Sequence, residues 1–233
     1  VVVMDLPCAF DPVAAKAGVS LPYRWQEDYP ARVGLLRRDG AGEIIWVDIE
    51  PCYIFHPLNA YEDAVGDVIL DAVRHPKMFA AKDVVGPNDG PPTLDRWVIS
   101  PRFRTAGRST IDDRPQEFPR HDERQEGAYS RYSYTTELNP RSDDEGLIKT
   151  DLKTGERVVH SAPGRHHMEG VFVPRSSASG EDDGWVMAFA WDQASNDGVV
   201  VILDAGDFAN TPVATIHLPQ RVPFGFHGNW IAD

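Results

Sequence analysis

The sequence predicts an all-β protein, and three of its features carry this prediction. Short runs rich in β-branched and aromatic residues recur along the whole chain of 233 residues. Glycine, asparagine and aspartate residues, which favour tight turns, separate these runs. Segments with the 3.6-residue period of an amphipathic helix are scarce. Many short strands at fairly regular spacing are typical of a sandwich, a barrel or a propeller, and the periodicity does not choose among these three architectures.

The expected strands follow one another from the first residue almost to the last. Three of the intervening turns contain residues that accept positive φ: DG at 39–40, KTG at 153–155 and NDG at 196–198. In chain order, the expected strands are 1–6, 32–37, 44–47, 68–73, 94–99, 147–151, 157–160, 171–174, 185–191, 199–204 and 213–218.

One short helix and one long loop interrupt this pattern. Asp11 is suited to cap a helix, Pro12 to begin it and Gly18 to stop it, so a helical turn is expected over 12–17. The segment 84–92 is rich in proline and glycine and is expected to be irregular. A plain connector explains it more simply than a substrate entrance does.

The composition limits the classes of function. The formal net charge of −13 argues against binding to nucleic acid or to anionic membrane surfaces, and it fits a soluble protein with a neutral or weakly polar ligand. No apolar run approaches the ~20 residues that a membrane-spanning helix needs. Cys8 and Cys52 form neither a disulfide framework nor a metal-binding spacing, so we expect a reducing, cytoplasmic compartment.

Two histidines, His56 and His227, lie in apolar and aromatic runs without the charged neighbours typical of a surface histidine. Burying an imidazole costs free energy unless both ring nitrogens find partners. A metal on one nitrogen and a carboxylate on the other meets that need and fixes the tautomer. For either histidine alone, a core imidazole bonded to the backbone is the simpler explanation. The argument for a metal therefore depends on the pair.

Four short motifs stand out along the chain. They are FHPLNAYE at 55–62, PQEFP at 115–119, MEGVFVP at 168–174 and FGFHG at 224–228. In this order they resemble motifs of the carotenoid cleavage oxygenases. The third departs from the family pattern, because Gly170 stands where proline or alanine is usual.

The resemblance implies a single Fe(II) ion held by four histidines at the axis of a seven-bladed β-propeller. His56 resembles the third of these ligands and His227 the fourth. Glu117 resembles the glutamate that orients the third histidine, and Glu169 the one that orients the fourth. Ligand type alone does not exclude zinc, copper or nickel, since neutral imidazole suits all of them.

The same resemblance implies that the chain is part of a longer one. The segment 1–7 resembles the strand that follows the family's second histidine, so the first two ligands are expected upstream of Val1. We therefore expect residues 1–233 to be the C-terminal portion of a single propeller domain. They would form roughly its C-terminal half or more, which amounts to about five blades of four strands.

The implied reaction is oxidative cleavage of a carbon–carbon double bond by dioxygen, which gives two carbonyl products. The substrate would be an apolar conjugated molecule: a carotenoid, an apocarotenoid or a stilbene. No catalytic residue beyond the metal centre is expected. Phe55, Phe224 and Phe226 are candidates for lining the substrate tunnel, and packing within a blade explains them equally well. The family also includes an isomerase, so the resemblance does not fix the reaction.

Two rival interpretations stay open. An incomplete or degenerate propeller would bind an apolar ligand or a partner without catalysis. The HDE sequence at 121–123 resembles part of a two-histidine, one-carboxylate iron triad, but no distal histidine is evident. HHMEG at 166–170 has no histidine after Glu169, so the inverted zinc-protease pattern fails. Four of the remaining histidines are expected in turns or at strand edges: His75, His121, His160 and His217. His166 and His167 are adjacent and are expected to point in different directions.

Overall fold

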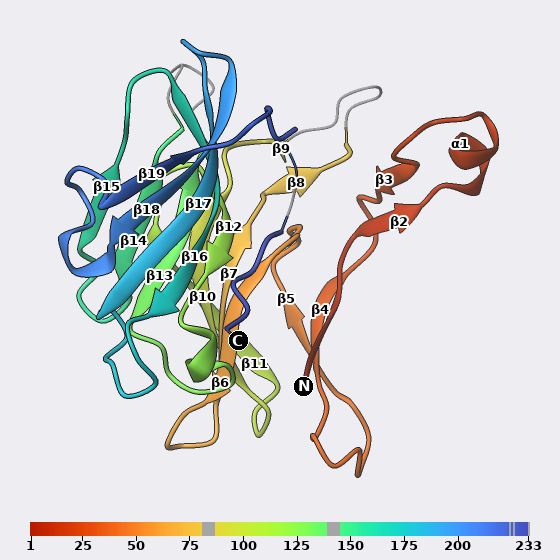
Figure 1. Cartoon of the computed structure of the whole chain (residues 1–233). Coiled ribbons are helices and arrows are strands. Elements are labelled where there is room, and N and C mark those ends of the chain that lie inside the picture. Colours follow the sequence, from red (N-terminus) through yellow and green to blue (C-terminus); the bar gives the residue numbers. More distant parts are fainter. Residues whose placement is uncertain (81–86, 139–144, 224, 226, 233) are drawn as a thin grey trace. The chain divides into compact units, whose positions relative to one another are not determined.

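The structure is a computed structural model of the chain, and it describes residues 1–80, 87–138, 145–223, 225 and 227–232. Two compact units make up the chain, Val1–Asp113 and Arg114–Asp233, and each is described by itself. The expected all-β class is confirmed, because antiparallel sheets account for most of the regular structure (Figure 1). Among the described residues, no helix is long and apolar enough to cross a membrane.

Two antiparallel sheets share one hydrophobic core in the first unit. The core includes Val33, Leu70 and Trp97, whose side chains are almost completely buried. A three-stranded sheet has the order β1-β4-β5, with β1 (Val2–Asp5), β4 (Ala31–Leu35) and β5 (Ile45–Ile49). A four-stranded sheet has the order β11-β10-β7-β6, with β6 (Pro57–Glu62), β7 (Val68–Arg74), β10 (Thr93–Ser100) and β11 (Thr105–Asp112).

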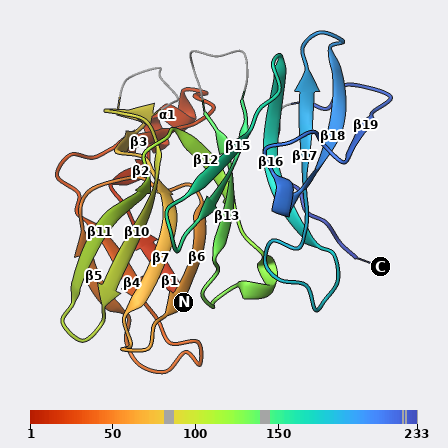
Figure 2. The ribbon, with the colours of Figure 1, turned by 90° about the vertical axis from the view of Figure 1, so that its left-hand side faces the viewer.

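A small hairpin extends beyond one end of β4 in the first unit (Figures 1 and 2). It consists of β2 (Cys8–Phe10) and β3 (Tyr23–Trp25), with the helical turn α1 (Pro12–Lys16) between them in the sequence. The carboxylate of Asp11 accepts hydrogen bonds from the backbone N–H groups of Val13 (2.9 Å) and Ala14 (3.0 Å). No residue of α1 is buried, so the cap and the proline, rather than packing, determine this helix as the sequence predicted.

Two four-stranded antiparallel sheets form the second unit. Tyr134 is fully buried in its core and stacks on Phe172, with ring centroids 5.7 Å apart. One sheet has the order β12-β13-β14-β15, with β12 (Gln116–Arg120), β13 (Tyr132–Glu137), β14 (Leu147–Asp151) and β15 (Arg157–His160). The other has the order β16-β17-β18-β19, with β16 (Arg165–Pro174), β17 (Gly184–Asp192), β18 (Asp197–Asp204) and β19 (Ala214–His217).

Each strand expected from the sequence overlaps an observed strand, but several strands were not expected. The strand β11 was missed because most of its side chains are exposed, which removes the alternation of apolar and polar residues. Two others contain a proline, at Pro57 of β6 and Pro119 of β12, which lowers the expectation of a strand. Part of the expected loop 84–92 is also a strand, because β9 (Pro87–Asn88) pairs with β8 (Lys77–Met78); residues 84–86 lie outside the described residues.

The number of sheets differs from the number of blades inferred from chain length. Four sheets of three or four strands are present in the described residues, together with the two-stranded pairs β2-β3 and β8-β9, where about five blades were expected. The difference arises because the β2–β3 hairpin with α1 and the β8–β9 pair take up residues without contributing to a four-stranded blade. The seven-bladed ring stays an expectation.

Candidate functional site

Glu169 and His227, which are 58 positions apart in the sequence, are in direct contact. The Nδ1 atom of His227 lies 3.2 Å from Oε1 of Glu169. The other carboxylate oxygen, Oε2, accepts a hydrogen bond of 3.0 Å from the backbone N–H of Gly228. Since a carboxylate only accepts, the pair fits a neutral imidazole with its proton on Nδ1. In that tautomer Nε2 carries the lone pair and is the nitrogen available to a metal.

Burial differs sharply between the two members of this pair. The side chain of Glu169 is 6% exposed, whereas the imidazole of His227 is 55% exposed. The burial expected for His227 from its apolar neighbours is therefore wrong for this chain. One aromatic ring lies against the imidazole, that of Phe118, with centroids 6.2 Å apart and the planes at 74°. A buried carboxylate thus holds an imidazole whose ring remains accessible.

Both predicted glutamates of the second unit lie at β-bulges. In β12, Glu117 is opposite Thr136 and Arg120 is opposite Tyr134, so three steps along β12 match two along β13. In β16, the pairing with β17 shifts by one residue in the same way between His167 and Gly170, which brackets Glu169. A bulge redirects side chains relative to the regular alternation of a strand. The carboxylates are therefore aimed by an irregularity of the sheet.

Glu117 is 5% exposed, and its Oε2 accepts a hydrogen bond of 2.7 Å from the backbone N–H of Phe118. Phe118 has a φ of 54°, in the left-handed region that side chains other than glycine rarely adopt. This conformation belongs to the bulge and turns the chain directly after the glutamate. Glu117 is thus a buried carboxylate and not a surface one.

His56 lies in the first unit, directly before β6. Its ring is half-buried, and its carbonyl oxygen accepts a hydrogen bond of 3.2 Å from the backbone N–H of Val73. The pairing of β6 with β7 shifts between Pro57 and Asn59, so a bulge follows this histidine as well. Because His56 belongs to one unit while Glu117 and His227 belong to the other, the expected convergence of the two histidines and the Glu117–His56 contact stay predictions.

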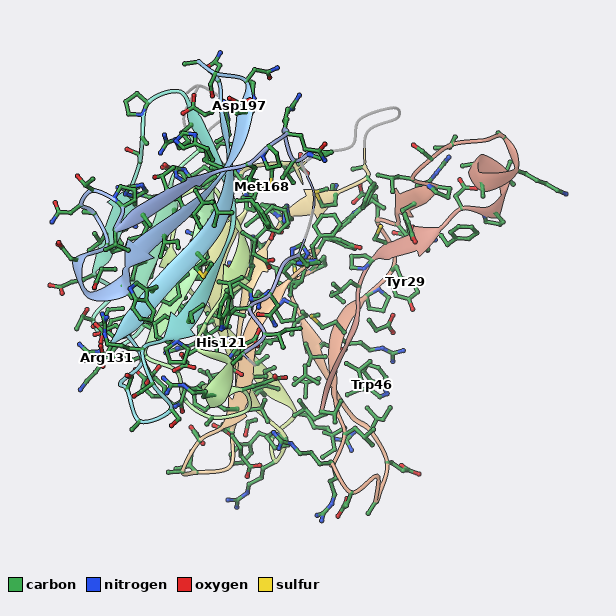
Figure 3. The ribbon with its side chains drawn as sticks, in the orientation of Figure 1. Tyr29, Trp46, His121, Arg131, Met168 and Asp197 are labelled. Atoms are coloured by element: carbon green, nitrogen blue, oxygen red, sulfur yellow. The ribbon has the colours of Figure 1, made fainter. Side chains whose placement is uncertain are left out.

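A pocket of about 200 Å³ in the second unit is lined by residues that are close in sequence to Glu169 and His227. Apart from Glu145 and His167, its lining is largely apolar, and Met168, labelled in Figure 3, immediately precedes Glu169. His167 is 2% exposed, and burial lowers the pKa of its imidazole to about 4. The ring is therefore uncharged at neutral pH. The residues lining the pocket are Phe118, Thr136, Leu138, Glu145, His167, Met168 and Gly225.

The three phenylalanines that were candidates for lining a tunnel are only partly described. Phe55 is 40% exposed, and its ring packs against Tyr53, His75 and Phe79 at centroid distances of 4.6 to 6.1 Å. Phe55 thus belongs to an aromatic cluster of the first unit, and its role in lining a tunnel stays a prediction. Phe224 and Phe226 lie outside the described residues.

Several histidines expected at turns or strand edges are buried instead. His75, His121 and His160 are 3%, 8% and 4% exposed, respectively, and burial lowers the pKa of His121 and of His160. The charged neighbours that indicated exposure point elsewhere: Asp122, which follows His121 (Figure 3), binds the guanidinium of Arg124. That ion pair also occupies the Asp122 carboxylate, and Glu123 is paired with Arg120, so neither carboxylate of the HDE sequence is available as an iron ligand.

The arrangement around His227 fits one position of a metal site. In the part of the chain that is described, there is no group of three or more His, Cys, Asp or Glu side chains that would hold an ion by itself. What the structure does show is an accessible imidazole whose Nδ1 is bonded to a buried carboxylate, the arrangement that orients a metal-binding histidine. Sequence reasoning missed Arg120 and His167. Arg120 lies 3.2 Å from the carboxylate of Glu169. In the sequence, only its position directly after the EFP motif could have indicated this contact.

The sequence matches known proteins over almost all of its length. The family model described as "Retinal pigment epithelial membrane protein" matches residues 1–232. A carotenoid cleavage oxygenase of Mycobacterium tuberculosis is 43% identical over 223 residues, which are 90% of this chain and 44% of the relative. Apocarotenoid-15,15'-oxygenase of Synechocystis is 31% identical over 217 residues, 89% of this chain and 44% of the relative. The chain spans about half the length of the curated relatives it matches.

Solved structures agree with the sequence comparison. A variant of the Synechocystis apocarotenoid oxygenase superposes with a TM-score of 0.88 at 27% identity, over 100% of this chain and 51% of that one. The cobalt-substituted form of the same oxygenase gives a TM-score of 0.86 at 26% identity, with the same coverage. Family model, sequence identity and fold agree, and the chain belongs to the carotenoid cleavage oxygenase family.

Proposed function

We propose that the native protein is an Fe(II)-dependent dioxygenase that cleaves a carbon–carbon double bond of a carotenoid, an apocarotenoid or a stilbene into two carbonyl products. The names of the relatives support the oxygenase class, and the cobalt-substituted relative supports a metal. When bound, the iron would supply the activation of dioxygen, which side chains cannot provide. Residues of this chain would bind and orient the ion.

His56 and His227 would each offer Nε2 to the ion, and Glu117 and Glu169 would hold their outer nitrogens. The observation that carries this assignment is the contact of 3.2 Å between Glu169 and His227. It pairs the two residues that the family motifs assign to each other, across 58 positions of sequence. A histidine that merely lies at the surface does not explain a partner carboxylate that is 6% exposed. Burial of that negative charge costs free energy unless the charge is paired.

The surroundings of the pair suit an apolar substrate. Leu138, Met168 and Phe118 give the nearby pocket an apolar lining, and His167 adds no charge to it at neutral pH. The formal net charge of −13 disfavours nucleic acid as a partner. Both cysteines are free, and burial raises the pKa of each thiol to about 11, which is compatible with the cytoplasm as the compartment.

Replacement of the two histidines tests the proposal. In the full-length protein, we expect H56A and H227A each to lose most of the bound iron and the cleavage activity, because a site that lacks one of four imidazoles binds weakly. H217A is the matched control, since His217 is an exposed histidine on the edge strand β19. Iron is measured by mass spectrometry and the carbonyl products by chromatography. Full iron content in H56A and H227A would overturn the assignment of these histidines, and a wild-type protein that binds no iron would support a non-catalytic apolar-ligand module instead.

A further inference from the structure

Arg120, the last residue of β12, contacts four groups around the Glu169–His227 pair. Its NH1 lies 3.2 Å from Oε1 of Glu169 and donates a hydrogen bond of 3.2 Å to the carbonyl of Gly228. Its NH2 donates to Oδ1 of Asn229 at 3.3 Å and forms a short contact with Glu123. The side chain is 16% exposed, so most of the guanidinium is enclosed by these partners. One residue thus touches both the carboxylate and the backbone next to His227.

The segment that carries His227 depends on such contacts for its position. After β19 ends at His217, the described residues of the tail form no further strand, and Trp230 and Ile231 are 52% and 86% exposed. Packing of residues 227–232 therefore contributes little to their placement. The hydrogen bonds that the structure shows for residues 227–229 lead to Glu169, Arg120 and Glu123: Gly228 bonds the first two, and the amide of Asn229 donates to Glu123 at 3.2 Å.

The bulge in β12 puts Arg120 where it can make these contacts. Residues three apart on a regular strand point to opposite faces of the sheet. Because the bulge makes Glu117 opposite Thr136 and Arg120 opposite Tyr134, the two side chains share one face. The hydroxyl of Thr136 on that face donates to the carbonyl of Met168 at 3.2 Å, so this face is the one that meets β16 and Glu169.

Arg120 also acts on His227 through the carboxylate that the two side chains share. Oε1 of Glu169 is shared between the imidazole and the guanidinium, at 3.2 Å from each. A guanidinium opposite a carboxylate fixes the orientation of that carboxylate through charge-assisted hydrogen bonds. A lysine could not replace this arrangement, because a single ammonium does not present a planar fork to several acceptors at once.

We propose that Arg120 is a positioning residue of the metal site. Its guanidinium holds Glu169, Gly228 and Asn229 in one arrangement and so directs the Nε2 of His227 toward the metal. The inference rests on the proposed role of His227 as a ligand and adds a residue that acts on it through Glu169. Arg120 itself touches neither metal nor substrate.

The test uses Co(II) as the probe, bound to the full-length protein after removal of its native metal. We expect R120Q to weaken Co(II) binding about 10-fold in competition with a chelator, and to shift the visible d–d bands, which report ligand geometry. R120K keeps the charge without the fork and should restore only part of the affinity. R165Q is the matched control, because Arg165 is similarly exposed (21%) and pairs with Asp192 in the same unit; it should retain wild-type affinity and spectrum.

Because Arg120 acts on His227 through Glu169, we expect the effects of R120Q and E169Q on Co(II) affinity not to be additive. R120Q/E169Q should bind Co(II) more weakly than E169Q by less than the factor that R120Q causes alone, because without the carboxylate Arg120 keeps only its contacts with Gly228 and Asn229. A double variant weaker by the product of the two single effects would overturn the inference. Wild-type Co(II) affinity and spectrum in R120Q, together with weakened Co(II) binding in H227A, would also overturn the inference. That result would leave the proposed function unaffected. Wild-type affinity in H227A would instead overturn the proposed function, and this inference with it.

Discussion

The carboxylate of Glu169 shows how a single residue links the sequence motif to the chemistry of the site. Its two oxygens accept from the ring of His227, the backbone of Gly228 and the guanidinium of Arg120. A buried negative charge is stable only when it is compensated in this way. The same hydrogen bonds orient the imidazole. Function and stability therefore depend on the same few hydrogen bonds.

Amide replacements of the two glutamates test this role. We expect E117Q and E169Q each to lower iron occupancy or activity by about 10–100-fold, because an amide keeps the shape but loses the charge that holds an imidazole N–H. E156Q is the control, since Glu156 is exposed in the turn between β14 and β15. Metal analysis and product chromatography of the full-length variants give the result. Wild-type iron content and turnover in both variants would mean that the two glutamates have only a structural role.

His167 makes the stability of the fold depend on pH. Burial lowers the pKa of its imidazole from 6.5 to about 4, so the unfolded chain binds more protons than the folded one between these values. The stability contribution is complete above pH 6.5 and decreases as the pH falls toward 4. From pH 7 to pH 4.5 the loss due to this residue should be about 2 kcal/mol.

Urea unfolding at these two pH values, for the wild type and H167Q, checks this prediction. The variant lacks the titrating group, so its stability should fall less between pH 7 and pH 4.5 than that of the wild type. His121 contributes in the same direction in both proteins and cancels in the comparison. An equal fall in the two proteins would show that His167 does not titrate as its burial implies.

At the level of the strands, irregularities determine where the site residues point. The bulges in β12 and β16 hold Glu117 and Glu169, and another follows His56 in β6. The β16 bulge also explains the departure of Gly170 from the family pattern. A Cβ atom at Gly170 would lie 3.0 Å from Cγ1 of Val186 and 3.4 Å from Cδ2 of Leu147, which is too tight for an added methyl group without adjustment.

This packing predicts a coupling between β16 and β17. We expect G170A to destabilise the protein by about 1 kcal/mol, because the added methyl group overpacks a buried site. In a V186A background the clashing atom is absent, so the same substitution should cost less, with a coupling of about 1 kcal/mol in a double-mutant cycle. G107A is the control, since a Cβ at Gly107 in β11 meets nothing within 4 Å. Additive effects of G170A and V186A on the free energy of unfolding would contradict the packing argument.

For the molecule as a whole, the proposed site requires both units, because His56 lies in one and His227 in the other. If both histidines bind the same ion, removal of the second should add little once the first is gone. H56A/H227A should then bind Fe(II) no more weakly than the weaker of the two single variants. Chelator competition measures the three affinities. Losses that multiply in the double variant would indicate two separate metal sites.

Local chemistry was sufficient to predict much of the fold. Asp11, Pro12 and Gly18 define α1, and apolar runs such as 147–151 and 157–160 coincide with β14 and β15. These elements were predictable because caps, turns and alternation act over a few residues. The four motifs, read as a set, indicated the family and the residues of the site.

Tertiary structure alone decided which of these residues meet. The contact of Glu169 with His227 joins β16 to an irregular tail, and the sequence does not record the bulges that aim Glu117, Glu169 and Arg120. The burial of His121 was likewise hidden, because its neighbour Asp122 is paired with Arg124. Side-chain direction depends on strand register, and register is fixed by pairing between distant segments. For this reason the sequence determined the family and the ligand candidates, while the fold determined their geometry.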